Sequence, residues 1–551
     1  MTDCKKIAEL IFSDVDKSTE YYEELYPVRD LPEGARVTRF APSPTGYLHF
    51  GGLYAGFASK LTADTTGGVF MLRIEDTDKK REVEDGVTGI VTGLEAFGVA
   101  PDEGVTGFKV EKGSYGPYTQ SHRREIYRAF AKKLMEEGKA YPCFCTPEEL
   151  DEIRAKQESE DIKGYYGSYA KCRDLTDEEI IEKVNAGVPY TVRLRSTGDI
   201  SRKIKFEDMI KGKIEMSENV NDVVVLKADG IPTYHFAHAV DDHLMRTTHV
   251  VRGDEWIASV PVHIELFRAL GNKPLKYAHI APIMKEENGG KRKLSKRKDP
   301  EANVSYYIEK GYPEAAVKEY MLTILNSNFE EWRKANKTED ISKFPFNLKK
   351  MSVSGALFDM VKFNDVSKNV ISVMTAKEVY KLVTDWAMDY NEVLYALLSE
   401  DKEKATAIFN IDRDNPKPRK DIACWEEVEN YVSFFYNEIY DADYTLPEHL
   451  NKEDAIEILT KYKDVYSKDD TKEEWFNKIK ELCSDCGFTP NVKEYKQNPD
   501  AFKGHVGDVS TVIRIAITSR TNTPDLYYIL QILGTDEVMR RIDDAINSYK
   551  A

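Results

Sequence analysis

Long apolar runs are missing from this 551-residue chain. No stretch approaches 18 consecutive apolar residues, and the first residues lack a basic segment followed by an apolar one. A transmembrane helix needs about 20 such residues, so we expect no membrane span and no secretory signal. Cysteine is also scarce: the seven cysteines are unevenly spaced. Such spacing does not suggest a disulfide framework and favours a reducing, cytoplasmic setting.

An excess of basic residues is missing as well, because 78 Lys and Arg against 95 Asp and Glu leave a net charge of −17. This balance argues against a protein that coats nucleic acid through its overall charge. It does not exclude RNA binding, which depends on local basic patches. One dense patch runs from Lys291 to Lys298. The length predicts three to five structural units.

The order of local signals predicts a parallel α/β unit that is interrupted by an insertion. A strand at Val37–Ala41 is followed by a Pro/Gly turn, a helix from about Gly52 to Leu61 and a strand at Val69–Ile74. Residues from about 119 to 227 look different, and strand signals return at Val223–Leu226, His249–Arg252 and Tyr277–Ile280.

Helical periodicity dominates from about Tyr306 onward. Apolar residues repeat at i, i+3, i+4, i+7 in three places, which predicts a helical C-terminal third. The three sets are Val317, Tyr320, Met321, Ile324; Val509, Val512, Ile513, Ala516; and Leu526, Ile529, Leu530, Leu533. Before the first strand, residues 1–35 form a polar segment with one amphipathic stretch, Ile7, Leu10 and Ile11.

Two motifs could bind phosphate. The first, Arg39–Gly52, brings a strand into a tight turn and then a helix, whose N-terminus favours phosphate while His49 can donate a hydrogen bond. The second, Lys293–Arg297, clusters cations after Gly289-Gly290 and can neutralise a triphosphate. Taken alone, the first could be a Pro/Gly turn beside a core histidine, and the second a solvated basic loop.

Together the motifs resemble the two nucleotide-binding motifs of class I aminoacyl-tRNA synthetases, with His49-Phe50-Gly51-Gly52 in the place of the first. The wider sequence, from about residue 37 to the end, resembles the bacterial-type glutamyl-tRNA synthetases, most weakly between 370 and 500. Glycine at the fourth position of the first motif is usual in that branch. The matching stretches are Arg39–Gly52, Leu72–Asp78, Gly138–Leu150, Gly230–Glu255, Lys293–Arg297, Gly355–Asp359 and Val509–Asp543.

The resemblance implies a multidomain fold of α/β and all-α parts. A Rossmann-like parallel-sheet catalytic domain carries an acceptor-binding insertion and is followed by a helical stem-contact and anticodon-binding region. The predicted parts are an N-terminal extension (1–36), the two catalytic halves (37–118 and 228–295), the insertion (119–227), the stem-contact region (296–370) and the anticodon-binding region (371–551).

The resemblance also implies an ATP site and a glutamate site. ATP, with Mg²⁺, is expected at Pro42, His49, Gly51, Gly52, Glu255, Lys293, Leu294, Ser295, Lys296 and Arg297. Of these, His49, Lys293, Lys296 and Arg297 are expected to act in catalysis. The glutamate pocket is expected at Arg39, Ala41, Ser43, Glu75, Tyr234, His238 and Arg252.

Charge supports the glutamate assignment. Free glutamate has one ammonium and two carboxylates, so its site needs an acid and cations, and arginine suits carboxylates by its fork geometry. By the resemblance, Glu75 faces the α-amino group and Arg252 the side-chain carboxylate, with Arg39 assisting. A cation at position 252 would favour glutamate over glutamine. Any of these residues could instead form a structural ion pair. Asp241-Asp242-His243 could indicate a metal or acid–base site, but its analogue in the family is structural and supports the fold near the pocket.

The predicted insertion carries Cys143, Cys145 and Cys172, which resemble a zinc site of some bacterial members. Tetrahedral zinc needs a fourth ligand. Tyr169 is nearest to the expected position but one residue short in its spacing, and Tyr165 or Tyr166 are alternatives. Three free thiols are the competing interpretation.

The reaction that the resemblance implies is ATP-dependent formation of glutamyl-adenylate and transfer of the glutamyl group to tRNA(Glu). Whether tRNA(Gln) is a second substrate stays open. The expected partners are tRNA, L-glutamate and ATP, and we expect a cytoplasmic monomer. The rival hypotheses are a glutaminyl-tRNA synthetase, a shortened paralogue without an anticodon domain, and a non-catalytic RNA-binding protein on the same fold. The last is disfavoured by the presence of His49 and Lys296.

Overall fold

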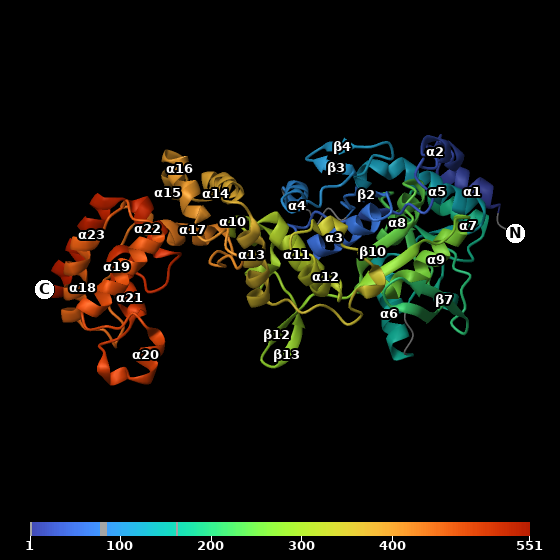
Figure 1. Ribbon diagram of the computed structural model, residues 1–551. Coiled ribbons are helices and arrows are strands. Elements are labelled where there is room, and N and C mark those ends of the chain that lie inside the picture. The colour runs from blue at the N-terminus through green and yellow to red at the C-terminus, as the bar shows by residue number, and fades with distance from the viewer. Residues whose placement is uncertain (1–2, 78–84, 161–163) are drawn as a thin grey trace. The chain divides into compact units, whose positions relative to one another are not determined.

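The computed structural model describes residues 3–77, 85–160 and 164–551 (Figure 1). Asp78, the last residue of one matching stretch, lies outside them. The chain divides into two compact units. One consists of Met1–Ile308 and Lys318–Asp359 and holds the parallel strands, and the other consists of Glu309–Val317 and Met360–Ala551 and is helical.

Parallel strands form the centre of the first unit. β1 (Val37–Phe40), β2 (Val69–Leu72) and β3 (Glu103–Gly107) pair side by side in parallel. β10 (His249–Gly253) and β11 (Lys276–Ile280) form a second parallel pair, and the Thr248 N–H donates to the Val37 carbonyl at 2.9 Å. β1 therefore has β2 on one side and the start of β10 on the other. In open α/β sheets, ligands bind where the strand order reverses in this way.

Helices connect these strands. α3 (Phe50–Asp64) joins β1 to β2, while α8 (Tyr234–Leu244) precedes β10 and α9 (Val260–Ala269) follows it (Figure 1). Parallel strands are covered on both faces and therefore carry buried side chains throughout. β1 and β2 follow this rule, with Val37, Phe70 and Met71 at most 2% exposed. The predicted α/β class with Rossmann-like parallel strands is confirmed.

The range predicted as an insertion contains a small antiparallel sheet of its own. β5 (Ala140–Cys143), β6 (Thr191–Leu194) and β9 (Val224–Leu226) pair in that order, with α5 (Arg124–Glu136), α6 (Pro147–Ser159) and α7 (Asp177–Asn185) between and before them. The hairpin of β7 (Lys203–Asp208) and β8 (Gly212–Ser217) lies in the same range, yet β7 pairs in parallel with β11. That stretch thus reaches the parallel pair of β10 and β11.

Two short helices, α1 (Cys4–Ile11) and α2 (Thr19–Leu25), precede β1. The amphipathic stretch predicted there is α1, whose buried residues include Ile7 and Ile11. Further along, Glu23 accepts a hydrogen bond from Arg246 at 2.8 Å, and Arg29 donates to the Met245 carbonyl at 3.1 and 3.0 Å. The segment before β1 is therefore packed against Met245 and Arg246, which follow α8.

The helical unit has a continuous apolar core. Two of the three periodic sets predicted from the sequence belong to its helices α21 and α22, and Val512, Ile513 and Ile529 are at most 1% exposed. Thr375 with Glu378 and Thr471 with Glu474 form capping boxes that start α14 and α19. The helices are α13 (Met360–Val373), α14 (Ala376–Tyr390), α15 (Glu392–Glu400), α16 (Lys402–Asn410), α17 (Val428–Val432), α18 (Lys452–Val465), α19 (Lys472–Asp485), α20 (Val492–Gln497), α21 (Val506–Thr518), α22 (Leu526–Leu533) and α23 (Thr535–Lys550).

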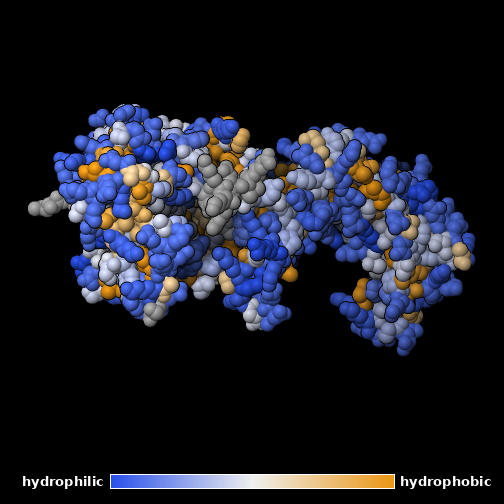
Figure 2. Space-filling model, turned by 180° about the vertical axis from the view of Figure 1, so that it is seen from behind, coloured by the Kyte–Doolittle hydropathy of each residue, from blue (hydrophilic) through white to orange (hydrophobic). Residues whose placement is uncertain are grey.

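Several further elements follow β11 in the first unit or at its boundary with the second. They are a hairpin of β12 (Met284–Glu287) and β13 (Gly290–Lys293), then α10 (Val304–Lys310), α11 (Glu314–Leu325) and α12 (Phe329–Ala335). Two short elements, β4 (Val110–Lys112) and α4 (Gly86–Glu95), flank β3. None of the helices in the described ranges combines the length and apolar composition that a bilayer crossing requires. Figure 2 shows a mainly hydrophilic face with apolar residues in scattered patches.

Candidate active site

A cavity of about 390 Å³ opens at the carboxyl ends of β1 and β10. Its volume lies in the range of small-molecule sites, and its position is the point where the strand order reverses. Most of the predicted site residues line it: Arg39, Ala41, Ser43, His49, Gly51, Gly52, Glu75, Tyr234, Arg252, Glu255, Lys293 and Leu294. The cavity thus joins the two predicted motifs, which are about 240 residues apart in sequence, as the positions of His49 and Lys293 show.

His49 caps the N-terminus of α3. Its Nδ1 accepts a hydrogen bond from the Gly51 N–H at 2.8 Å, so the proton of the neutral ring is on Nε2. Burial lowers the pKa of His49 to about 4, and the nearby Lys296 and Lys293 act in the same direction. The ring is therefore neutral at pH 7 and presents an N–H donor. Gly51 permits this arrangement, because a Cβ there would lie 3.1 Å from His49 Nδ1.

The basic loop after β13 is held by a buried carboxylate. Asp299 accepts two hydrogen bonds from Arg292, at 2.6 and 2.7 Å, and one from the Ser295 N–H at 2.9 Å. The Lys296 ammonium donates to the backbone carbonyl of Tyr47, within the first motif. Ser295, Lys296 and Arg297 do not line the cavity itself. The loop therefore lies beside the first motif, with Lys293 and Leu294 at the cavity wall.

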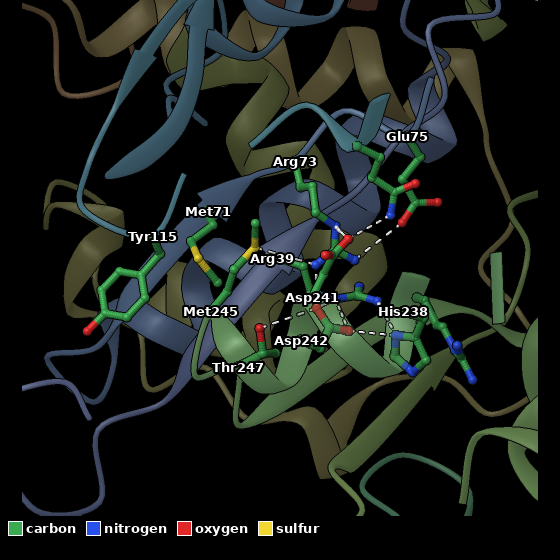
Figure 3. A network of polar contacts seen from close by, with 12 residues as sticks. Arg39, Met71, Arg73, Glu75, Tyr115, His238, Asp241, Asp242, Met245 and Thr247 are labelled. Atoms are coloured by element: carbon green, nitrogen blue, oxygen red, sulfur yellow. Dashed lines mark hydrogen bonds and ion pairs between the residues drawn. The ribbon is translucent and has the colours of Figure 1, made fainter. Parts of the chain in front are cut away.

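A network of arginines and carboxylates includes the cavity residues Arg39 and Glu75 (Figure 3). Asp242 is at its centre and is paired with Arg39 Nε at 3.0 Å, Arg73 Nη1 at 2.6 Å and His238 Nδ1 at 2.6 Å. The neighbouring Asp241 binds Arg123 Nε at 2.7 Å. Both aspartates are fully buried. Their contacts match the structural interpretation of this pair.

Glu75 is the acid of the network that reaches the cavity. It follows β2, its backbone N–H donates to the Pro42 carbonyl at 3.0 Å, and its carboxylate accepts from Arg73 Nη2 at 3.3 Å. Burial raises the pKa of Glu75 to about 7, against the opposing effect of Arg73 and Arg39. Pro42 contributes through this backbone contact and does not line the cavity.

Arg252 has a different environment from the other arginines. It lies at the end of β10 and is 6% exposed, and its polar contacts are to the Tyr234 hydroxyl, the Trp256 carbonyl and two histidine rings. No carboxylate in the described part of the chain pairs with it. The three arginines of the network, by contrast, face three carboxylates, namely Asp241, Asp242 and Glu75.

His238 is completely buried and does not line the cavity. Its Nδ1 contacts Asp242, and its Nε2 lies 3.2 Å from the Tyr277 hydroxyl, so both ring nitrogens are engaged behind the pocket. Burial lowers the pKa of His238 to about 3. His238 therefore contacts Asp242 and Arg39 from behind and can hold them in place.

The three cysteines of the predicted zinc site do meet. Their sulfur atoms lie within 4.8 Å of one another, with Cys145 Sγ 3.7 Å from Cys172 Sγ. The Tyr165 hydroxyl lies 3.5 Å from Cys143 Sγ and 3.2 Å from Cys145 Sγ. Tyr169 points elsewhere, with its hydroxyl on Glu160. The tyrosine of this cluster is therefore Tyr165, which was one of the alternatives from the sequence.

A second cavity, of about 400 Å³, lies in the helical unit. Arg419, Arg520, Tyr431 and Phe434 contribute to its wall. The Arg520 guanidinium lies 5.2 Å from the centroid of the Phe434 ring and donates to Ser433 Oγ at 3.0 Å. Within the described residues it pairs with no acid. Cations beside aromatic rings are the groups that bind single-stranded nucleic acid.

Several of these residues escaped the sequence analysis. Arg73 lies in the matching stretch Leu72–Asp78 but received no role, and His263 stands outside every matching stretch. Asp208 lies in the predicted insertion and gave no signal of contact with β11. Tyr431 and Arg520 could not be singled out, because basic and aromatic residues are common in helical segments. Their roles depend on contacts between distant parts of the chain.

Comparison with known proteins agrees with this geometry. The family model described as tRNA synthetases class I (E and Q), catalytic domain, matches residues 36–365, and one for an anticodon binding domain matches residues 493–546. A glutamate–tRNA ligase of Clostridium perfringens is 50% identical over 98% of this chain and 100% of its own length. One from Sorangium cellulosum is 45% identical over 97% of this chain and 99% of its own.

Solved structures give the same result. The crystal structure of a glutamate tRNA ligase from Elizabethkingia meningosepticum, in complex with its amino acid, superposes with a TM-score of 0.73 at 29% identity. It covers 93% of this chain and 99% of that one. Two parallel-strand halves surround a common cavity with both nucleotide motifs at its wall, and relatives that match over their full length reach 50% identity. The chain therefore belongs to the glutamate–tRNA ligases of the class I tRNA synthetase family.

Proposed function

We propose that this chain activates L-glutamate with ATP and transfers the glutamyl group to the 3′-terminal adenosine of tRNA(Glu). The observation that carries the proposal is Arg252, a buried cation without a carboxylate partner among the described residues, which faces the same cavity as Glu75 and His49. A ligand with an ammonium group and a net negative charge fits such a site, and glutamate has both.

In the first step, an oxygen of the glutamate α-carboxylate attacks the α-phosphorus of ATP. The bond to the bridging oxygen breaks, and pyrophosphate leaves with its electron pair. His49 Nε2–H would donate to a phosphate oxygen, and Lys293, Lys296 and Arg297 would stabilise the charge on the leaving pyrophosphate. Mg²⁺, bound with the ATP phosphates, would add further charge neutralisation. Because no protein nucleophile is needed, positioning and electrostatics do most of the catalysis.

Within the cavity, Glu75 would bind the α-ammonium group and Arg252 the side-chain carboxylate of glutamate. Arg39, Ala41, Ser43 and Tyr234 would complete the amino-acid site, and Glu255 with Gly51 and Gly52 the nucleotide site. In the second step, the 2′-hydroxyl of the terminal adenosine attacks the glutamyl carbonyl of the adenylate, and AMP leaves. The regions at 119–227 and 371–551 would hold the acceptor end and the anticodon, respectively.

The second cavity is our candidate for contact with anticodon bases. Arg520 would bind phosphate or base edges, and Tyr431 would stack on bases. Arg520→Ala should raise the KM for tRNA while leaving the KM for glutamate unchanged. An equal loss in both would assign Arg520 a structural role.

The cysteine cluster would hold zinc through Cys143, Cys145, Cys172 and the Tyr165 hydroxyl. Zn–S bonds of about 2.3 Å in a tetrahedron place sulfur atoms about 3.8 Å apart, and the Cys145–Cys172 separation of 3.7 Å fits. Zinc would organise the fold around these side chains. Metal analysis of the purified protein and of Cys172→Ser tests this, and an absence of zinc from the unaltered protein would refute it.

Charging assays with separately purified tRNA(Glu) and tRNA(Gln) and labelled glutamate test the proposed function. We expect the enzyme to charge tRNA(Glu) with glutamate. The assay with tRNA(Gln) decides whether that tRNA is a second substrate. We further propose that it acts as a monomer in the cytoplasm. A protein that transfers no glutamate to either tRNA would refute the proposal.

A further inference from the structure

Arg252 is held by two buried histidines. Its Nε donates to His279 Nε2 at 3.1 Å, and its Nη2 lies 3.3 Å from His263 Nδ1. Both rings are fully buried. The Trp256 carbonyl lies 3.4 Å from Nη2 and the Tyr234 hydroxyl 3.3 Å from Nη1, and the Tyr277 ring centroid is 4.9 Å from the guanidinium carbon. Every one of these acceptors is uncharged when the imidazoles are neutral.

The proton positions of both imidazoles are fixed by their other nitrogens. His279 Nδ1 lies 2.7 Å from Asp208 Oδ2, which can only accept, so Nδ1 carries the proton and Nε2 offers its lone pair to Arg252. Asp208 is itself held by the backbone N–H groups of Ile210 and Lys211, at 3.0 and 2.8 Å. His263 Nδ1 accepts from Arg252, which leaves the proton on Nε2, 3.0 Å from His235 Nδ1.

Burial keeps these rings neutral. It lowers the pKa of His263 well below its usual value, and the neighbouring His238 and Arg252 act in the same direction. Burial also lowers the pKa of His279, although the hydrogen bond to Asp208 opposes it. The nearest acid to Arg252 in this chain of contacts, Asp208, therefore acts through His279 and does not pair with the guanidinium.

The contrast with Arg39 and Arg73 shows what this arrangement achieves. Those two arginines bind Asp242 directly, so their charge is compensated within the protein. Arg252 is fixed at three of its nitrogens by neutral groups and keeps its charge for a ligand. Its Nη1 carries two protons, and Tyr234 is its one acceptor in the described residues. At least one N–H of Arg252, which lines the cavity, is thus left without an acceptor among the described residues.

We propose that His263 and His279 are positioning residues that hold Arg252 in place without compensating its charge, and that they thereby set the preference for a carboxylate over a carboxamide side chain. This inference rests on the proposed function, because it assigns the source of that enzyme's selectivity. A carboxylate in the place of either ring would hold the guanidinium equally well but would compete with the side-chain carboxylate of the substrate.

The matched pair His263→Asn and His263→Asp tests this proposal. The two substitutes have the same shape, and each places an acceptor near the position of Nδ1, but only Asp adds a charge. We measure kcat/KM for glutamate and for glutamine on tRNA(Glu), with the KM for ATP as a control. His263→Asp should have a kcat/KM for glutamate about 10- to 100-fold below that of His263→Asn, with an unchanged KM for ATP and a narrower preference for glutamate over glutamine.

Equal values for the two variants, or a loss shared by glutamate and ATP, would overturn the proposal. His279→Gln and His279→Leu give a second comparison if the His263 variants are unstable in thermal melts. Gln keeps an acceptor near the position of Nε2 and should retain more selectivity for glutamate than Leu, while equal selectivity would overturn the proposal. The unaltered enzyme in the same assay separates the two hypotheses: if it charges no glutamate, the proposed function itself fails.

Discussion

The chemistry of single residues in this site depends on their hydrogen-bond and ion-pair partners more than on residue type or burial. Arg39 and Arg252 are both buried arginines at the ends of parallel strands, yet one is paired with Asp242 and the other with neutral rings. The sequence predicted both as pocket residues by resemblance, and both line the cavity. Their difference in charge compensation could not be predicted, because it depends on the contacts of Arg252 with His263 and His279, to which the sequence assigned no role.

Glu75 leads to a prediction on pH. Its pKa is raised to about 7, so the free protein holds this carboxyl half-protonated at neutral pH. An ammonium group binds the carboxylate form, so kcat/KM for glutamate should rise up to tenfold per pH unit below pH 7 and level off above it. His49 adds nothing in this window, because its pKa is about 4.

The measurement is a pH profile of kcat/KM for glutamate between pH 5.5 and 8.5, with Glu75→Gln as the control. The variant should be weaker throughout and should lose the rise with pH. A rise of the same size in Glu75→Gln would assign the titration to another group.

Among the elements, the segment before β1 was the least understood from sequence. Its amphipathic stretch predicted α1, but nothing indicated that the helix would pack on α5 and α7 of the region 119–227. The bounds of β1 and α3 could be predicted within three residues at each end, because a strand, a Pro/Gly turn and a helix follow one another there. The hairpin of β7 and β8 was missed, because the pairing of β7 with β11 is a contact between distant segments.

The packing of α1 gives a stability prediction. Ile11 is 6% exposed, so Ile11→Ala should lower the free energy of unfolding by about 2–5 kcal/mol, from lost burial and the cavity that remains. Glu9→Ala, on the exposed side of the same helix, is the control and should change it by less than about 0.5 kcal/mol. Urea denaturation measures both. Equal effects of the two substitutions would show that the apolar face of α1 does not contribute to the free energy of unfolding.

At the scale of the whole molecule, the parallel-strand unit and the helical unit are chemically distinct. The class I architecture could be predicted because ordered motifs extend over most of the sequence, while the site in the helical unit could not, since no short motif marks Arg520 or Tyr431. The assignment of residues 296–370 to stem contact and of residues 371–551 to anticodon binding stays a prediction. Both parts are expected to bind one tRNA.

Dependence on tRNA tests the cooperation of these parts. The resemblance to glutamyl-tRNA synthetases predicts that glutamate activation requires bound tRNA. ATP–pyrophosphate exchange with glutamate should therefore be close to background without tRNA and should rise on addition of tRNA(Glu). Full exchange without tRNA would contradict this expectation, while leaving the assignment of the amino-acid site intact.

The central claim is that the uncompensated charge of Arg252 selects glutamate. The most direct measurement compares glutamate and glutamine charging of tRNA(Glu) by the unaltered enzyme and by Arg252→Gln. Loss of a charge that pairs with a buried carboxylate costs about 2–5 kcal/mol, so kcat/KM for glutamate should fall at least about 30-fold, with the KM for ATP unchanged. A variant that keeps its preference for glutamate over glutamine would contradict the account.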